Sequence, residues 1–186
     1  NQPIAHYWPE FAANGKAGVL VRHALSHQAG LPEFEGESTF EPTIDWQWLV
    51  DNLANATPAW PAGSQLAYQG FTFGTLIGEI VRRISGKTLG AFFREEVAGP
   101  LGADFHIGQP ESEHPRVAQI IDPEYRLAEI SASNGYGNAR ALARIMSLLA
   151  NGGELDGVRL LSRETLEAAI TGQVYAMDGS LGRPHH

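Results

Sequence analysis

Residues 61–84 read PAGSQLAYQGFTFGTLIGEIVRRI, and this stretch decides the fold that we expect for the chain. From Thr72 to Ile84, apolar residues recur at the three- and four-residue spacing of a helix face. Its members are Phe73, Leu76, Ile77, Ile80, Val81 and Ile84, with Glu79, Arg82 and Arg83 on the opposite face. Gly86 is a typical helix end. The stretch therefore predicts an amphipathic helix that follows a Pro/Gly turn and a tyrosine, Tyr68.

Other helices are predicted on both sides of this one. Capping residues and apolar spacing indicate them: Asp45 before Trp46, Leu49, Val50 and Leu53; residues 89–97, capped by Thr88, with Phe92, Phe93 and Val97 turned inward; Asn138 before a stripe of Ala139, Leu142, Met146 and Leu149; Ser162 before a helix to Ile170; and a short helix at residues 23–26.

Strand signals are few in this sequence. Residues 116–121 alternate weakly, and residues 157–161 are expected to pair locally after the Asp156-Gly157 turn. The stretches 32–43 and 108–124 are rich in proline and acidic residues and are predicted to be loops. The expected fold class is therefore α+β, predominantly helical with little sheet.

Composition excludes several classes of protein. About 43% of the 186 residues are apolar and the net charge is −8, which indicates a folded domain without the basic surface that nucleic acids require. The absence of cysteine excludes disulfides and thiolate chemistry but does not fix the compartment. No apolar run reaches the ~18 residues of a membrane span, and no secretory signal is visible, which favours a soluble, cytoplasmic protein.

Three short motifs suggest chemistry but have simpler explanations. His23 and His27 lie four residues apart, as in a zinc site, yet Ala24 stands where metalloproteases carry glutamate, so structural histidines and no metal are expected. Ser85-Gly86-Lys87-Thr88 lacks the earlier glycine of a phosphate loop and fits a turn between two helices. Asp178-Gly179-Ser180 lacks the first glycine of a nucleophile elbow and is predicted to be a loop.

Tyr68 is the main candidate for a catalytic residue. A single tyrosine is more often a half-buried packing residue than a catalyst. Its position at a junction between a loop and a helix favours function. The residues by themselves leave both interpretations open.

Five segments in order resemble the β-lactamase-like serine hydrolases, which include class C β-lactamases, DD-peptidases and related esterases. Residues 22–31 are similar to the family's R-H-L-L-S-H-T-S-G-L signature, and residues 61–68 resemble its P-G turn and catalytic tyrosine. The other three are residues 76–87, residues 100–102 and residues 137–153, which ends in the family's G-G stop. The resemblance implies a serine transpeptidase-like fold and acyl transfer without a cofactor, in which a serine attacks a carbonyl and a lysine and a tyrosine manage its proton. It implies that Tyr68 is the catalytic tyrosine.

Two family motifs have no counterpart in these residues. The S-x-x-K motif is absent, because Ala13 and Ile84 stand three residues before Lys16 and Lys87, and the K-T-G or H-x-G strand is absent too. The chain is therefore expected to be a single partial domain, residues 1–186, that is inactive alone. The family's Y-x-N reads Tyr68-Gln69-Gly70, which favours a carboxylesterase over a β-lactamase.

Two functions remain open on the sequence. The first is part of an esterase that acts on small ester or amide substrates, with self-association or docking of the missing segments. The second is a non-catalytic helical module, derived from the same fold, that binds a ligand or a partner.

Overall fold

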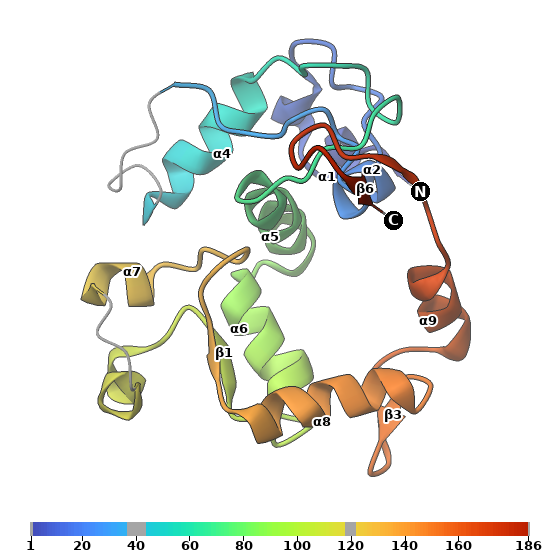
Figure 1. Cartoon of the computed structure of the whole chain (residues 1–186). Helices are drawn as coiled ribbons and strands as arrows, with labels where there is room; N and C mark the ends of the chain where they lie inside the picture. Colours follow the sequence, from blue (N-terminus) through green and yellow to red (C-terminus); the bar gives the residue numbers. More distant parts are fainter. Residues whose placement is uncertain (1, 37–43, 118–121, 186) are drawn as a thin grey trace. The chain divides into compact units, whose positions relative to one another are not determined.

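The computed structural model describes residues 2–36, 44–117 and 122–185 (Figure 1). Contacts between residues divide the chain into two compact units. The first unit comprises Asn1–Thr88, Ile130–Ser133 and Gln173–His186, and the second comprises Leu89–Glu129 and Asn134–Gly172. The first unit is thus assembled from three separate stretches of sequence. The expectation of one partial domain over residues 1–186 stays a prediction.

The first unit is mainly helical. Its elements are α1 (Ile4–Tyr7), the 3-10 helix η1 (Pro9–Ala12), α2 (Val21–Leu25), α4 (Trp46–Asn55), α5 (Thr72–Ser85) and the antiparallel pair β5 (Ala176–Met177) and β6 (Pro184–His185). Its core consists of apolar side chains from these helices and the loops between them: Ile4, Trp8, Phe11, Val19, Ala24, Ala29, Leu31, Val50, Leu53, Ala54, Ala56, Leu76 and Ile80.

The predicted ends of α4 and α5 are confirmed. The Asp45 carboxylate accepts the backbone N–H groups of Gln47 and Trp48, which have no partner within α4. Gly86 ends α5 in the left-handed conformation, with φ 72°. Ser85 to Thr88 is therefore the turn after a helix, as expected.

The predicted polar face of α5 is partly wrong. Glu79 has no exposed surface, whereas Ile84, expected on the apolar face, is 61% exposed. Glu79 is covered by Trp46, whose indole N–H donates to the Glu79 carboxylate at 3.2 Å. A Cβ atom at Gly78 would come within 2.6 Å of the Trp46 ring, so this glycine is what lets the ring lie against α5. α5 is consequently covered on a side that its periodicity assigns to solvent.

The second unit has its own core. Its elements are α6 (Leu89–Phe93), the π-helix η2 (Arg94–Ala98), β1 (Phe105–Ile107), the 3-10 helix η3 (Glu111–Arg116), α7 (Pro123–Leu127), β2 (Gly135–Gly137), α8 (Ala139–Ala150), β3 (Glu154–Leu155), β4 (Val158–Arg159) and α9 (Arg163–Ile170). β1 pairs antiparallel with β2, and β3 with β4. Ala98, Leu101, Ala103, Ala141 and Leu148 form the core, and Phe93 and Val97 pack against it.

Several predictions in the second unit are confirmed. Asn138 caps α8 by accepting the Ala141 N–H, and Ser162 caps α9 by accepting the Thr165 N–H. Asp156 and Gly157 both have positive φ, 50° and 81°, as a tight hairpin turn between β3 and β4 requires. These three signals are local, which is why the sequence reveals them.

Three other predictions in this unit are corrected. The stripe of α8 is shifted: Ala141 and Leu148 are buried, while Leu142 and Met146 are 50% and 54% exposed. Arg116 ends the 3-10 helix η3, which contains Pro115, and so does not begin a strand; residues 118–121 of that predicted strand lie outside the described residues. The predicted loop 108–124 holds η3 and the start of α7, and the predicted helix 89–97 changes to a π-helix at Arg94.

The expected fold class is confirmed. Helices dominate, and the sheet within the described ranges consists of three two-stranded pairs. In the same ranges, no helix has both the length and the hydropathy that a bilayer crossing requires. Exposed large apolar side chains occur in both units, among them Leu25 and Ile84 in the first unit, and self-association through such surface stays a prediction.

Candidate active site

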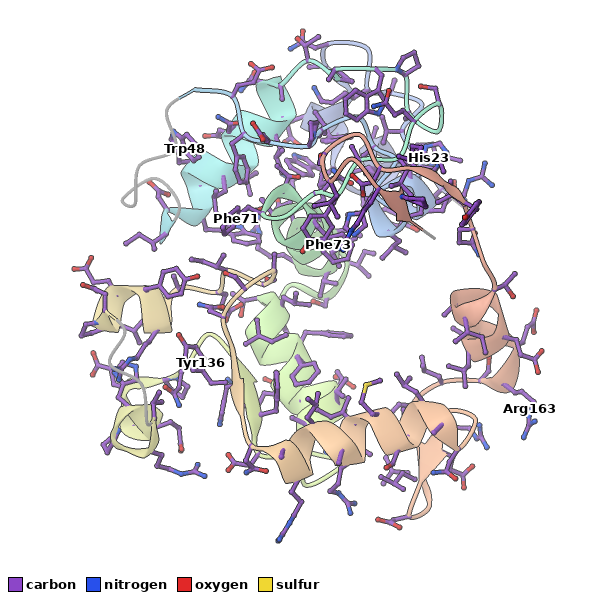
Figure 2. The ribbon with its side chains drawn as sticks, viewed as in Figure 1. His23, Trp48, Phe71, Phe73, Tyr136 and Arg163 are labelled. Carbon is purple, nitrogen blue, oxygen red and sulfur yellow. The ribbon has the colours of Figure 1, made fainter. Side chains whose placement is uncertain are left out.

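Tyr68 lies in the loop that leads into α5, and its ring is at the surface of the first unit. The residue is 42% exposed, so its phenol is not sealed in the core. Its ring lies 5.1 Å from the His27 ring, centroid to centroid, at an angle of 56°. Phe71, which precedes the first residue of α5, and Phe73, in its first turn, follow Tyr68 in the sequence and are labelled in Figure 2.

The backbone around Tyr68 is held on one side by residues 27–31. The Ala67 N–H donates to the His27 carbonyl at 3.0 Å, and the Gln69 N–H donates to His27 Nδ1 at 3.3 Å. Gln69 is 1% exposed, and its Nε2 donates to the Leu31 carbonyl at 3.0 Å. The segment is therefore fixed by main-chain and side-chain hydrogen bonds to the loop after α2.

Its other side is held by the turn between β5 and β6. The Tyr68 N–H donates to both carboxylate oxygens of Asp178, at 3.1 and 3.2 Å. The Gly179 N–H donates to the Leu66 carbonyl at 2.9 Å. Residues 66–69 thus lie between two loops and donate or accept alternately toward each, as a strand would.

A cavity of about 480 Å³ lies within the first unit, and Tyr68 is one of the residues that line it. Apolar side chains and glycines form most of its wall, and its described lining consists of Pro32, Glu33, Phe34, Gly36, Tyr68, Gly70, Phe71 and Ser180. Glu33 is the charged member of this lining, and neither Lys16 nor Lys87 belongs to it. This volume is in the range of small-molecule sites, with a hydroxyl-bearing aromatic residue at its wall.

The sequence model of the Beta-lactamase family matches residues 1–184, which is nearly the whole chain. This chain belongs to the β-lactamase family. It is 39% identical to the esterase/β-lactamase LipL of Mycobacterium tuberculosis, over 87% of the chain and 47% of LipL. The chain thus spans about half the length of this curated relative.

Solved structures of the family agree with this membership. A penicillin-binding protein homologue from Caulobacter crescentus is 39% identical with a TM-score of 0.90, over 98% of this chain and 57% of that one. A family VIII carboxylesterase is 35% identical with a TM-score of 0.95, and the match covers 99% of this chain and 57% of the carboxylesterase chain. EstA from Arthrobacter nitroguajacolicus is 29% identical with a TM-score of 0.86, and the match covers 98% of this chain and 58% of the EstA chain. The predicted β-lactamase-like fold is therefore confirmed.

The family's R-H-L-L-S-H-like segment has a structural role in the described residues. His23 Nδ1 accepts the Leu20 N–H at 3.2 Å at the start of α2, and burial together with Arg22 lowers the pKa of His23. His27 lies beyond the end of α2 with a positive φ of 56°, so the two histidines do not share a helix face as the sequence suggested. Gly63 has φ 83°, and a Cβ atom there would meet His23 Nε2 at 3.3 Å, which explains a glycine at this turn.

The serines near Tyr68 occupy different settings. Ser26 Oγ donates to the Arg22 carbonyl, and Ser64 Oγ donates to the Pro61 carbonyl at 2.6 Å, so both hydroxyls serve local turns. Ser180 lines the cavity, and its N–H donates to Asp178 at 2.8 Å. Ser180 follows β5, but as part of a hairpin turn and without a lysine among the cavity residues.

Sequence reasoning missed Asp178 and the cavity walls. The sequence predicts a loop at Asp178, yet this residue is 1% exposed and contacts the tyrosine segment from 110 residues away. Asp-Gly-Ser is a signature of a turn in which the aspartate binds its own following backbone, so the hairpin was accessible to prediction. The contact of Asp178 with Tyr68, in contrast, has no signature in the sequence.

Buried charges elsewhere in the first unit are satisfied without a ligand. The Lys16 ammonium donates to the Ala56 carbonyl and lies 5.4 Å from the centre of the Phe11 ring, and burial lowers the pKa of this lysine. The Glu79 carboxylate accepts hydrogen bonds from Arg82 at 2.7 Å and from Arg83 at 2.6 Å. Burial alone would raise the pKa of Glu79, but the two arginines outweigh it and lower the pKa.

Proposed function

We propose that this chain supplies the catalytic tyrosine, Tyr68, and part of the substrate cavity of a β-lactamase-like serine carboxylesterase. The observation that carries the proposal is the position of Tyr68 at the wall of a cavity of about 480 Å³, on a backbone held from both sides. A fixed main chain leaves the phenol only its side-chain torsions. Such preorganisation is what proton transfer in acyl transfer requires.

The proposed reaction is acyl transfer to a serine. The phenolate oxygen of Tyr68 accepts the serine proton as the serine attacks the ester carbonyl, and returns a proton to the leaving alcohol as the acyl-enzyme forms. A neighbouring lysine would favour the phenolate. Since residues 1–186 contain no S-x-x-K motif, we propose that the nucleophile and this lysine lie outside these residues and that the 186-residue chain alone is inactive.

The cavity supports an uncharged ester as substrate. Pro32, Phe34 and Phe71 provide apolar and aromatic surface for an acyl or alcohol group, and Glu33 would repel a carboxylate. Gly70, where the family's Y-x-N motif carries asparagine, offers no side-chain amide to a β-lactam. The name of one relative, a family VIII carboxylesterase, is in line with this choice, while LipL is named both an esterase and a β-lactamase.

The decisive experiment replaces Tyr68 by phenylalanine in the full-length gene product. We expect kcat for an activated aryl ester to fall by about 10²- to 10⁴-fold, the usual contribution of a general acid–base group, with the melting temperature unchanged. Tyr175→Phe is the matched control, because Tyr175 belongs to the same unit, is 75% exposed and is absent from the cavity lining. Equal turnover in the two variants would contradict the role of Tyr68.

A second candidate function is the non-catalytic binding module, which the missing S-x-x-K motif favours. A serine-directed fluorophosphonate separates the two. Stoichiometric labelling of one serine in the full-length product, and none in the 186-residue chain, supports the esterase. No labelling in either protein supports the binding module, and labelling of the short chain at Ser26, Ser64 or Ser180 would overturn the proposed position of the nucleophile.

A further inference from the structure

Asp178 occupies the turn of the hairpin formed by β5 and β6. Its carboxylate oxygen Oδ1 accepts the N–H groups of Ser180 at 2.8 Å and Leu181 at 2.9 Å, and its own N–H donates to the Arg183 carbonyl at 2.9 Å. An aspartate that binds its following backbone in this way closes a turn by itself. The turn is therefore held by hydrogen bonds within the hairpin itself.

The same carboxylate also binds the tyrosine segment. Both of its oxygens accept the Tyr68 N–H, and the adjacent Gly179 N–H donates to the Leu66 carbonyl. Asp178 is 1% exposed, so water does not compete for these bonds. Hydrogen bonds to a charged acceptor are stronger than neutral ones, and more so when they are shielded from water.

We propose that Asp178 is a positioning residue for Tyr68. Asp178 is absent from the cavity lining, so it acts through the backbone of Tyr68 and not on a substrate. Asp178 and His27 bind the N–H groups of two successive residues, Tyr68 and Gln69, and so fix the direction in which the Tyr68 side chain leaves the main chain. The effect on turnover rests on the proposed function of Tyr68, whereas the effect on its position does not.

The variant Asp178→Asn isolates this role. An asparagine keeps one oxygen for the Ser180 and Leu181 N–H groups, so the hairpin turn survives. The retained Oδ1 still accepts the Tyr68 N–H, but the side chain loses its charge and presents an NH₂ group in place of Oδ2, the second acceptor of that N–H. We expect the tyrosine segment to loosen while the turn remains.

The measurement is ¹⁹F NMR of the full-length gene product labelled with 3-fluorotyrosine, with the Tyr68 signal assigned by its loss in Tyr68→Phe. We expect Asp178→Asn to shift and broaden this signal, to speed hydrogen exchange of the Tyr68 amide at least tenfold, and to lower kcat for an aryl ester with KM little changed. A displacement near 1 Å at a reacting group can lower turnover on the order of 10²-fold.

Asp45→Asn is the matched control. Asp45 also belongs to the first unit and also accepts two backbone N–H groups, those of Gln47 and Trp48, but it caps α4 and does not bind the tyrosine segment. A merely structural loss should therefore lower the melting temperature in both variants. Only Asp178→Asn should move the Tyr68 signal.

If Asp178→Asn does not fold, the unmodified protein still decides the matter. A long-range HNCO experiment should detect coupling across the hydrogen bond between the Tyr68 amide nitrogen and the Asp178 carboxylate carbon. Absence of that coupling, or an unmoved Tyr68 signal in a folded Asp178→Asn variant, overturns the proposal. If Asp178→Asn moves the Tyr68 signal but Tyr68→Phe retains turnover, Asp178 does position Tyr68, and it is the proposed function of Tyr68 that is overturned.

Discussion

Glu79 and Asp178 are two carboxylates sealed inside the first unit, and the hydrogen-bond partners described for them differ in kind. Glu79 binds charged side chains one turn further along its own helix, Arg82 and Arg83, together with the Trp46 indole. Asp178 binds backbone N–H groups, two in its own turn and one 110 residues earlier. The first arrangement stabilises a helix and its packing, whereas the second joins distant segments of chain at the cavity wall. Burial of a charge therefore does not by itself indicate a functional site; the place of its partners does.

The largest effect on stability is expected from Glu79→Gln. The substitution keeps the shape but removes the charge that faces Arg82 and Arg83, and breaking a buried ion pair costs about 3–5 kcal/mol. Arg82 is partly exposed, with 42% of its side chain accessible, so we expect a value near the lower end. Urea unfolding measures the change in free energy.

The same variant sharpens the contrast with Asp178. In folded Glu79→Gln, the ¹⁹F signal of fluorinated Tyr68 should stay at its original position, because Glu79 is not bonded to the tyrosine segment in the described contacts. A shift as large as that in Asp178→Asn would mean that the two carboxylates are coupled and that Glu79 also influences the tyrosine segment.

Acid should reveal the second largest effect. The arginines lower the pKa of Glu79 in the folded state below its usual value of 4.5. The stabilisation is therefore complete above pH 4.5 and is lost as the pH falls toward the lowered pKa, since the unfolded state then binds the proton more readily. As the pH is lowered from about 6 to about 3, the unfolding free energy should fall more steeply in the unmodified protein than in Glu79→Gln. Parallel curves would show that Glu79 is not the group responsible.

The smallest effect is expected at a third carboxylate, Glu33, which lines the cavity and is exposed. Glu33→Gln should change the unfolding free energy by less than about 0.5 kcal/mol, as is usual for surface positions. In the full-length product it should raise kcat/KM for an anionic ester about fivefold relative to a neutral ester of the same size, because a single charge in water-rich surroundings acts with only ~1 kcal/mol. Asp51→Asn, on an exposed residue of α4 outside the cavity lining, should leave this ratio unchanged.

The sequence predicted local features well and burial less well. Asp45, Asn138 and Ser162 each cap the helix that follows them, because a cap depends on three or four neighbouring residues. Glu79 was placed on the solvent face because periodicity describes one helix alone, and Trp46 arrives from another. The stripe of α8 was shifted for the same reason, since neighbouring residues decide which of two adjacent apolar rows is buried.

The candidate site shows the same limit. Tyr68 could be singled out by its junction with α5 and by resemblance to the family, and its catalytic role stays a proposal. Gln69 occupies an anchoring position that a sequence pattern does not reveal, because its buried amide binds the Leu31 carbonyl 38 residues away. Asp178 has the signature of a turn, but its bond to Tyr68 exists only once the chain has folded.

The separation between Tyr68 and Asp178 also has a consequence for the order of events during synthesis. At roughly 5–20 residues per second, a ribosome covers the separation of 110 residues in about 5–20 s. During that interval the second unit, Leu89–Glu129 and Asn134–Gly172, is synthesised, while Gln173–His186 of the first unit has yet to be made. The nascent chain therefore carries residues 66–69 with one edge unpaired until Gln173–His186 has been made. During that interval the unpaired edge can associate with another chain.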